Sequence, residues 1–97
     1  MRISDNLKNR LKKFFYESFG NEIEIILFGS RVDDSKKGGD FDFAIKNLSK
    51  EEFKKKKLIF IKNLLMNDLD DLPIDLVHFE SSIELFKSEI LKKGIKI

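Results

Sequence analysis

Apolar and polar residues follow two periods along this chain, one typical of helices and the other of strands. Between Ser4, a predicted N-cap, and Gly20 the large apolar residues recur with helical spacing, which predicts a helix over residues 4–19. An apolar, β-branched run then predicts a buried strand over residues 22–28, and strict alternation predicts a second strand over residues 41–46. The first half of the chain is therefore predicted to contain one helix followed by two strands.

The second half continues with helices on either side of one strand. A Ser-Lys-Glu-Glu capping box predicts a helix over residues 50–68. The positions that this helix is expected to bury are Phe53, Phe60, Ile61, Leu64 and Leu65. Beyond a proline, residues 74–79 are predicted to form a third strand, and a second capping box at residues 81–84 predicts a last helix that ends at Gly94. The order α-β-(short α)-β-α-β-α predicts an α/β or α+β fold, with a small mixed sheet flanked by helices.

Length and composition limit the class of protein. A chain of 97 residues is expected to form one domain, residues 1–97. Although 37% of the residues are charged, the net charge is only +2, which disfavours a dedicated nucleic-acid-binding protein. The chain has no cysteine and no signal-peptide pattern, and its apolar runs are shorter than the roughly 20 residues of a membrane span. We therefore expect a soluble cytoplasmic domain.

Two aspartates at the start of the alternating strand are the first candidates for chemistry. Asp40 and Asp42 share one face of that strand, because side chains alternate with a period of two. Neighbouring carboxylates repel each other and are costly to bury unpaired, whereas Mg²⁺ binds such oxygen ligands. Alternatively, the two residues are a strand cap and a surface acid, since aspartate is common at strand ends. The Gly-Ser break nine residues upstream favours the metal site.

That Gly-Ser break suggests a place for phosphate groups. Gly29 allows the backbone to approach a ligand closely, and Ser30 is predicted to cap a short helical turn over residues 31–34. A strand, a glycine and a helix N-terminus together favour anion binding. Arg31 is either a solvated helix residue or a partner for triphosphate charge, and the sequence alone favours neither.

Other charged residues have competing interpretations. Asp75 interrupts the apolar strand predicted over residues 74–79, where it needs either a metal or a salt bridge to one of the many lysines. His78 alternates onto the opposite face and is interpreted as structural. The lysines at residues 36–37 and 54–57 are interpreted as solvent-facing, with a basic contact surface as the alternative for the second group.

These residues resemble a known family. The sequence has a Gly-Ser pair that is followed, after nine residues, by Asp-Phe-Asp. This pattern is similar to the signature of the polymerase-β-like nucleotidyltransferases, which has acidic residues on either side of a hydrophobic one. The string LFGSR…DFDFAI and the chain length are most similar to the minimal nucleotidyltransferases, or MNT proteins. The resemblance covers residues 22–79 and implies the nucleotidyltransferase fold.

The resemblance also implies an activity. It implies a magnesium-dependent or manganese-dependent enzyme that transfers AMP from ATP to an acceptor hydroxyl group. The implied catalytic and metal-binding residues are Asp40, Asp42 and Asp75, and the implied nucleotide-binding residues are Gly29, Ser30 and Arg31.

A partner protein is implied as well. Larger relatives carry an added helical domain for the acceptor, so another chain is expected to supply that surface here. For MNT proteins the implied partner is a HEPN-domain ribonuclease toxin from the adjacent gene. The resemblance implies that the MNT protein is the antitoxin, which binds this toxin and adenylylates a tyrosine. Whether the chain forms a homo-oligomer or a hetero-oligomer is left open by the sequence.

The chain departs from the family pattern at two positions. Asp34 and Gly39 stand where the family commonly has glycine and serine, and the charge of Asp34 is predicted to weaken triphosphate binding. This departure favours an alternative, a catalytically weakened domain that neutralises its partner by binding alone. A nucleic-acid-binding regulator, based on the lysines at residues 54–57, is a further alternative that the balanced charge disfavours.

Overall fold

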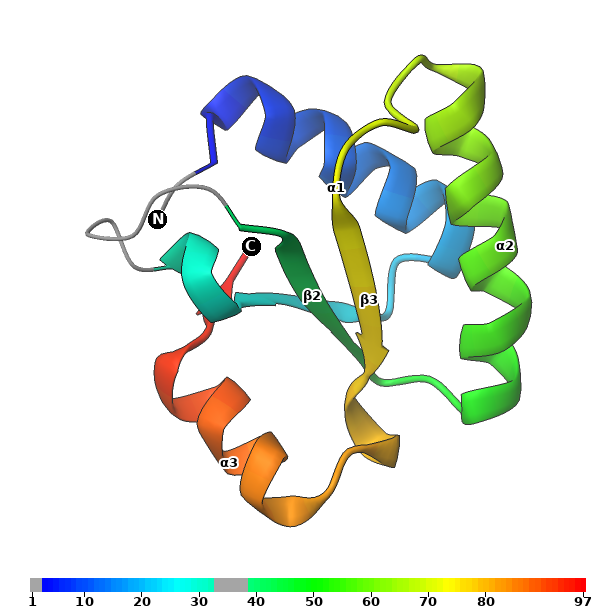
Figure 1. Cartoon of the computed structure of the whole chain (residues 1–97). Coiled ribbons are helices and arrows are strands. Elements are labelled where there is room, and N and C mark those ends of the chain that lie inside the picture. The colour runs from blue at the N-terminus through cyan, green and yellow to red at the C-terminus, as the bar shows by residue number, and fades with distance from the viewer. Residues whose placement is uncertain (1–2, 33–38) are drawn as a thin grey trace.

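The computed structural model describes residues 3–32 and 39–97, in which a mixed four-stranded sheet lies between helices (Figure 1). The helices are α1 (Asp5–Phe19), α2 (Lys50–Met66) and α3 (Glu84–Lys93). The strands are β1 (Glu24–Phe28), β2 (Phe41–Lys46), β3 (Ile74–His78) and β4 (Ile95–Lys96). Two short 3-10 helices, η1 (Gly29–Val32) and η2 (Phe79–Ser81), directly follow β1 and β3.

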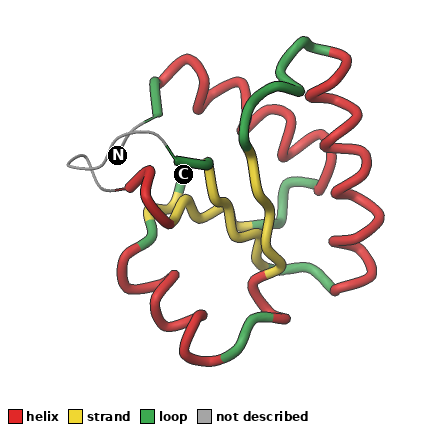
Figure 2. The backbone as a smooth tube through the Cα atoms, viewed as in Figure 1, coloured by secondary structure: helices red, strands yellow, loops and turns green. Residues whose placement is uncertain are grey.

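The sheet has the strand order β3-β2-β1-β4. Strand β2 pairs with β1 in the antiparallel sense and with β3 in the parallel sense, so the strand that carries Asp42 is internal and the strand that carries Asp75 is at an edge (Figure 2). The parallel pair is connected through α2, as parallel strands require a crossover.

Alternation along the strands divides the core between the two faces of the sheet. The larger cluster packs against α1 and α2, where the rings of Phe15 and Phe60 stack with centroids 4.3 Å apart and Phe43 meets Phe15 edge-on at 5.0 Å. The smaller cluster packs against α3 and consists of Ile26, Ala44, Phe79 and Ile90. Asp42 lies two residues before Ala44 and therefore on the same face as α3.

The predicted caps of the first two helices are confirmed. Ser4 accepts a hydrogen bond from the backbone nitrogen of Leu7 at 3.2 Å, and Ser49 accepts one from that of Glu52 at 3.1 Å. Strand β2 has the predicted bounds. Strand β1 begins two residues later than predicted, β3 ends one residue earlier, and α2 ends at Met66 rather than residue 68.

The predicted serine cap of the last helix is wrong. The N-cap residue of α3 is Ile83, which makes no side-chain capping bond. Both serines instead bind His78: Ser81 Oγ lies 2.6 Å from His78 Nδ1, and Ser82 Oγ donates to the His78 carbonyl at 3.2 Å. His78 is buried and its Nε2 lies 2.7 Å from the carbonyl of Leu48, as a structural histidine should be.

Two further predictions need correction. Ile61 and Leu65 were expected in the core, but they are 47% and 59% exposed, because α2 buries only the stripe of Phe53, Phe60 and Leu64. Strand β4 was not predicted; it is too short for a periodic signal and is held by pairing with β1. None of the helices in the described part of the chain is long and apolar enough to cross a membrane.

Candidate active site

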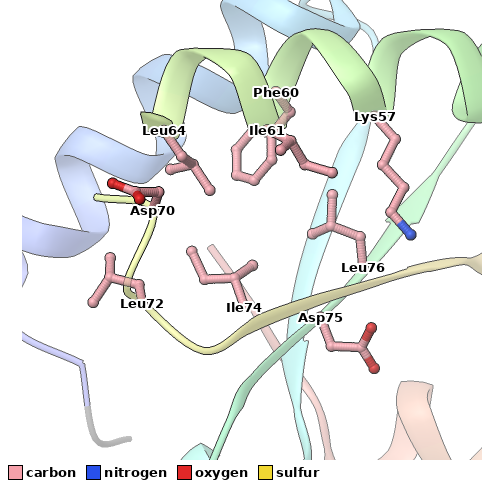
Figure 3. Close-up of a pocket in the computed structure, with 9 residues that line it drawn as sticks. All are labelled: Lys57, Phe60, Ile61, Leu64, Asp70, Leu72, Ile74, Asp75 and Leu76. Carbon is pink, nitrogen blue, oxygen red and sulfur yellow. The ribbon is translucent and has the colours of Figure 1, made fainter. Parts of the chain in front are cut away.

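Two carboxylates lie side by side on adjacent strands. Asp42 of β2 and Asp75 of β3 are register partners in the parallel pair, so their side chains project from the same face of strands about 4.8 Å apart. In Figure 3 the carboxylate of Asp75 points away from α2, whereas Ile74 and Leu76 point toward it. The two carboxylates therefore lie on adjacent strands, as a shared site would require.

The neighbouring carboxylates alter the pKa of Asp42. Partial burial, followed by the negative charges of Asp75 and Asp40, raises the pKa of the Asp42 carboxyl above its ordinary value. Asp40 is exposed and immediately precedes β2, so its charge is near enough to Asp42 to raise the pKa of that carboxyl. A cation would offset this repulsion, and carboxylate oxygens are ligands that suit Mg²⁺.

Gly29 brings the backbone against the same carboxylate. Phe28 at the end of β1 is the register partner of Asp42, so the chain turns into η1 beside it. Gly29 has a φ of +77°, and a Cβ atom added there would lie 2.5 Å from Oδ2 of Asp42. Only glycine fits this conformation and this space.

Arg31 connects the Gly-Ser turn to the start of β2. Its guanidinium carbon lies 3.9 Å from the centroid of the Phe41 ring, and its Nε donates to the carbonyl of Gly39 at 3.1 Å. The backbone nitrogen of Phe41 in turn donates to the carbonyl of Pro73 at 2.8 Å, next to β3. Arg31 is half-buried, and a role toward triphosphate remains a prediction. No sequence signal indicated its contact with Phe41.

The helical turn predicted over residues 31–34 begins two residues earlier than expected, and a capping role of Ser30 stays a prediction. The 3-10 helix η1 begins at Gly29 and places Ser30 inside it. A four-residue helix has too small a dipole to bind an anion by itself. Any phosphate contact would therefore depend on individual backbone groups and side chains of this turn.

The three predicted metal ligands are not one preformed cluster. Within residues 3–32 and 39–97, no three acidic or histidine side chains lie close enough together to hold an ion. The alternative interpretation of Asp75 finds no support either, since no lysine or arginine of the described residues forms an ion pair with it. Asp34 and the lysines at residues 36–37 lie outside the described residues. Metal binding by Asp40, Asp42 and Asp75 thus stays a prediction.

A small mixed sheet with paired carboxylates beside a glycine turn is the arrangement expected of a nucleotidyltransferase domain. The family model described as "Polymerase beta, Nucleotidyltransferase" matches residues 9–97, and this chain belongs to that family. The chain is also similar in structure to a chain of the crystal structure of a mutant toxin–antitoxin MntA–HpeT. The TM-score is 0.63 at 17% sequence identity, over 92% of this chain and 70% of that one. No curated protein matches the chain.

These comparisons confirm the expected fold class and the resemblance to the nucleotidyltransferases. The structural likeness covers 92% of this chain. At 17% identity it establishes the fold rather than a shared substrate or partner.

Proposed function

We propose that this protein is a metal-dependent nucleotidyltransferase that transfers AMP from ATP to a hydroxyl group of a partner protein. The observation that carries the proposal is the direct pairing of Asp42 with Asp75, beside Gly29, in a member of the nucleotidyltransferase family. Family membership supports transferase chemistry in general, and the choice of ATP and of a protein acceptor is part of the proposal.

The residues of the site are suited to a divalent ion and a triphosphate. Asp42 and Asp75, with Asp40 at the end of the strand, would hold Mg²⁺ or Mn²⁺, which would offset the charge of the carboxylates and the phosphates. Gly29 lets the backbone of the turn lie against the carboxylate of Asp42, and this turn, with Ser30, would contribute polar groups to the phosphates. Arg31 holds this turn against β2.

The proposed reaction is an in-line displacement at the α-phosphorus of ATP. The acceptor oxygen forms a bond to that phosphorus, while the bond to the bridging oxygen breaks and pyrophosphate leaves with the electron pair. The acceptor hydroxyl must lose its proton, and the exposed carboxylate of Asp75 is the candidate group to accept it.

The partner proposed for this protein is a helical HEPN-domain toxin. The likeness to a chain of a toxin–antitoxin complex supports a toxin as partner. Large apolar side chains on the outer surfaces of α2 and α3 form an exposed surface that such a partner could cover. Those that are more than half exposed are Leu58, Leu65, Met66, Ile83, Leu85 and Leu91.

The proposal can be tested with the product of the adjacent gene. We expect the two proteins to co-purify, and we expect the partner to gain the mass of AMP when ATP and Mg²⁺ are added. Removing the metal with EDTA should prevent the gain, as measured by intact mass spectrometry. A complex that never gains mass would favour neutralisation by binding alone, and the absence of a complex would refute the antitoxin role.

A further inference from the structure

A groove between η1 and α3 lies next to the carboxylate site. It has a volume of about 480 Å³, within the range of small-molecule sites. Its lining residues are Phe28, Gly29, Val32, Phe86, Glu89, Ile90 and Lys93. Figure 1 shows η1 close to the C-terminal half of α3, so the groove is formed by segments far apart in the sequence.

Two phenylalanines form an aromatic wall of this groove. The rings of Phe28 and Phe86 meet edge-on, with centroids 5.6 Å apart and an interplanar angle of 84°. Phe86 is 38% exposed although it belongs to a helix that packs against the sheet. An exposed aromatic face beside an apolar groove is suited to stacking with a planar ring, because every nucleobase presents a π-face.

The other end of the groove is charged. Glu89 and Lys93, one helical turn apart on α3, form an ion pair with a nitrogen–oxygen distance of 3.1 Å. A carboxylate can accept hydrogen bonds from hydroxyl or amino groups, and an ammonium group can donate them. The groove thus combines a planar apolar wall with a small number of polar groups, as ligand sites for nucleosides do.

The groove and the carboxylates belong to one continuous surface. Phe28 is the register partner of Asp42, and Asp42 is that of Asp75, so the three residues form a row across β1, β2 and β3. Two strand spacings, or about 10 Å, separate the ends of this row. Gly29 lines the groove, and its backbone also lies against the carboxylate of Asp42. A ligand with a flat apolar end and an anionic end could therefore span both.

We propose that this groove binds the nucleobase of a purine nucleoside triphosphate, with its base against Phe86 and its phosphates directed past Gly29 toward Asp42. This inference rests on the proposed nucleotidyltransferase function and adds a site that selects purines over pyrimidines. We expect a purine nucleotide to bind more tightly than a pyrimidine nucleotide, because the larger purine ring covers more of the aromatic wall.

The test compares nucleotide and phosphate binding in matched variants. The probes are ATP, UTP and inorganic tripolyphosphate, each with Mg²⁺, measured by calorimetry. Phe86→Ala should weaken ATP binding about tenfold or more, in keeping with base–aromatic stacking, and should change tripolyphosphate binding less than about twofold. Ser88→Ala, at an exposed residue of the same helix that does not line the groove, should bind ATP like the native protein. Phe86→Tyr should retain most of the affinity for ATP.

Each possible outcome of this test leads to a different conclusion. Native protein that binds ATP more tightly than UTP, with a loss specific to Phe86→Ala, supports the inference. Native protein that binds ATP, but for which Phe86→Ala weakens ATP and tripolyphosphate equally or not at all, overturns the inference and leaves the proposed function intact. If Phe86→Ala weakens only the complex with the protein partner, the groove is a partner surface and the inference is wrong. Native protein that binds none of the three probes refutes the proposed function together with the inference.

Discussion

Replacing Asp42 with asparagine is expected to lower the rate of AMP transfer at least about a hundredfold while leaving the metal-free protein as stable as the native one, or more stable. The loss of rate follows because a carboxylate ligand of a catalytic metal supports several kcal/mol of transition-state stabilisation, and 1.36 kcal/mol corresponds to a factor of ten. The measurement is pyrophosphate release in the presence of the partner, together with thermal unfolding in EDTA.

The effect on stability has a definite dependence on pH. The folded-state pKa of Asp42 is raised above 3.8 by burial and by the charges of Asp75 and Asp40. The folded state therefore binds the proton more tightly than the unfolded state does. The free energy of unfolding falls as the pH rises from about 3.8 through the raised pKa, and the deficit persists at neutral pH. Asp42→Asn removes this deficit, so its advantage over the native protein should appear only above that range.

Asp71→Asn provides the control for both effects. Asp71 is exposed in the turn before β3, outside the paired strands. Its replacement should alter neither the rate of transfer nor the pH dependence of unfolding. An Asp42→Asn protein with native activity, or one less stable than the native protein at neutral pH in EDTA, would show that the carboxylate has another role.

Gly29→Ala is expected to abolish transfer and also to destabilise the fold. Alanine at a φ of +77° costs roughly 1–2 kcal/mol, and its Cβ would collide with Oδ2 of Asp42, so that the carboxylate must move. For a domain of this size each kcal/mol lowers the melting temperature by about 4–8 °C. Thermal unfolding and ATP binding by calorimetry measure the two consequences separately.

Gly20→Ala separates backbone strain from the collision. Gly20 has a φ of +92°, but an added Cβ would meet nothing within 4 Å. This variant should lose stability comparably through strain while binding ATP and Mg²⁺ like the native protein. If Gly29→Ala retained native binding and activity, the closeness of Gly29 to Asp42 would have no functional meaning.

The parts of the fold with strong local signals could be predicted from the sequence. Serines at positions 4 and 49 set the starts of α1 and α2, and the alternation of Phe41, Phe43 and Ile45 set the bounds of β2. The cap of α3 could not be predicted, because Ser81 and Ser82 have a competing partner in His78, three and four residues upstream. Local sequence does not reveal which of two polar partners a serine takes.

The site could be predicted only in part for a related reason. Periodicity places Asp40 and Asp42 on one face, but the pairing of Asp42 with Asp75 depends on the strand order, which the sequence does not specify. The contact of Arg31 with Phe41 and the groove beside Phe86 both depend on tertiary packing between distant segments. Such contacts leave no periodic pattern.

The most direct test of a metal site at Asp40, Asp42 and Asp75 is a titration of the metal-free protein with Mn²⁺, in which electron paramagnetic resonance reports the free ion. The native protein and Asp71→Asn should each show a saturable site, and Asp42→Asn and Asp75→Asn should show a large loss of affinity. Asp40→Asn should weaken binding as well, to a smaller extent because Asp40 lies at the exposed end of the strand. Equal Mn²⁺ binding by the native protein and by both the Asp42→Asn and Asp75→Asn variants would show that these carboxylates do not form a metal site.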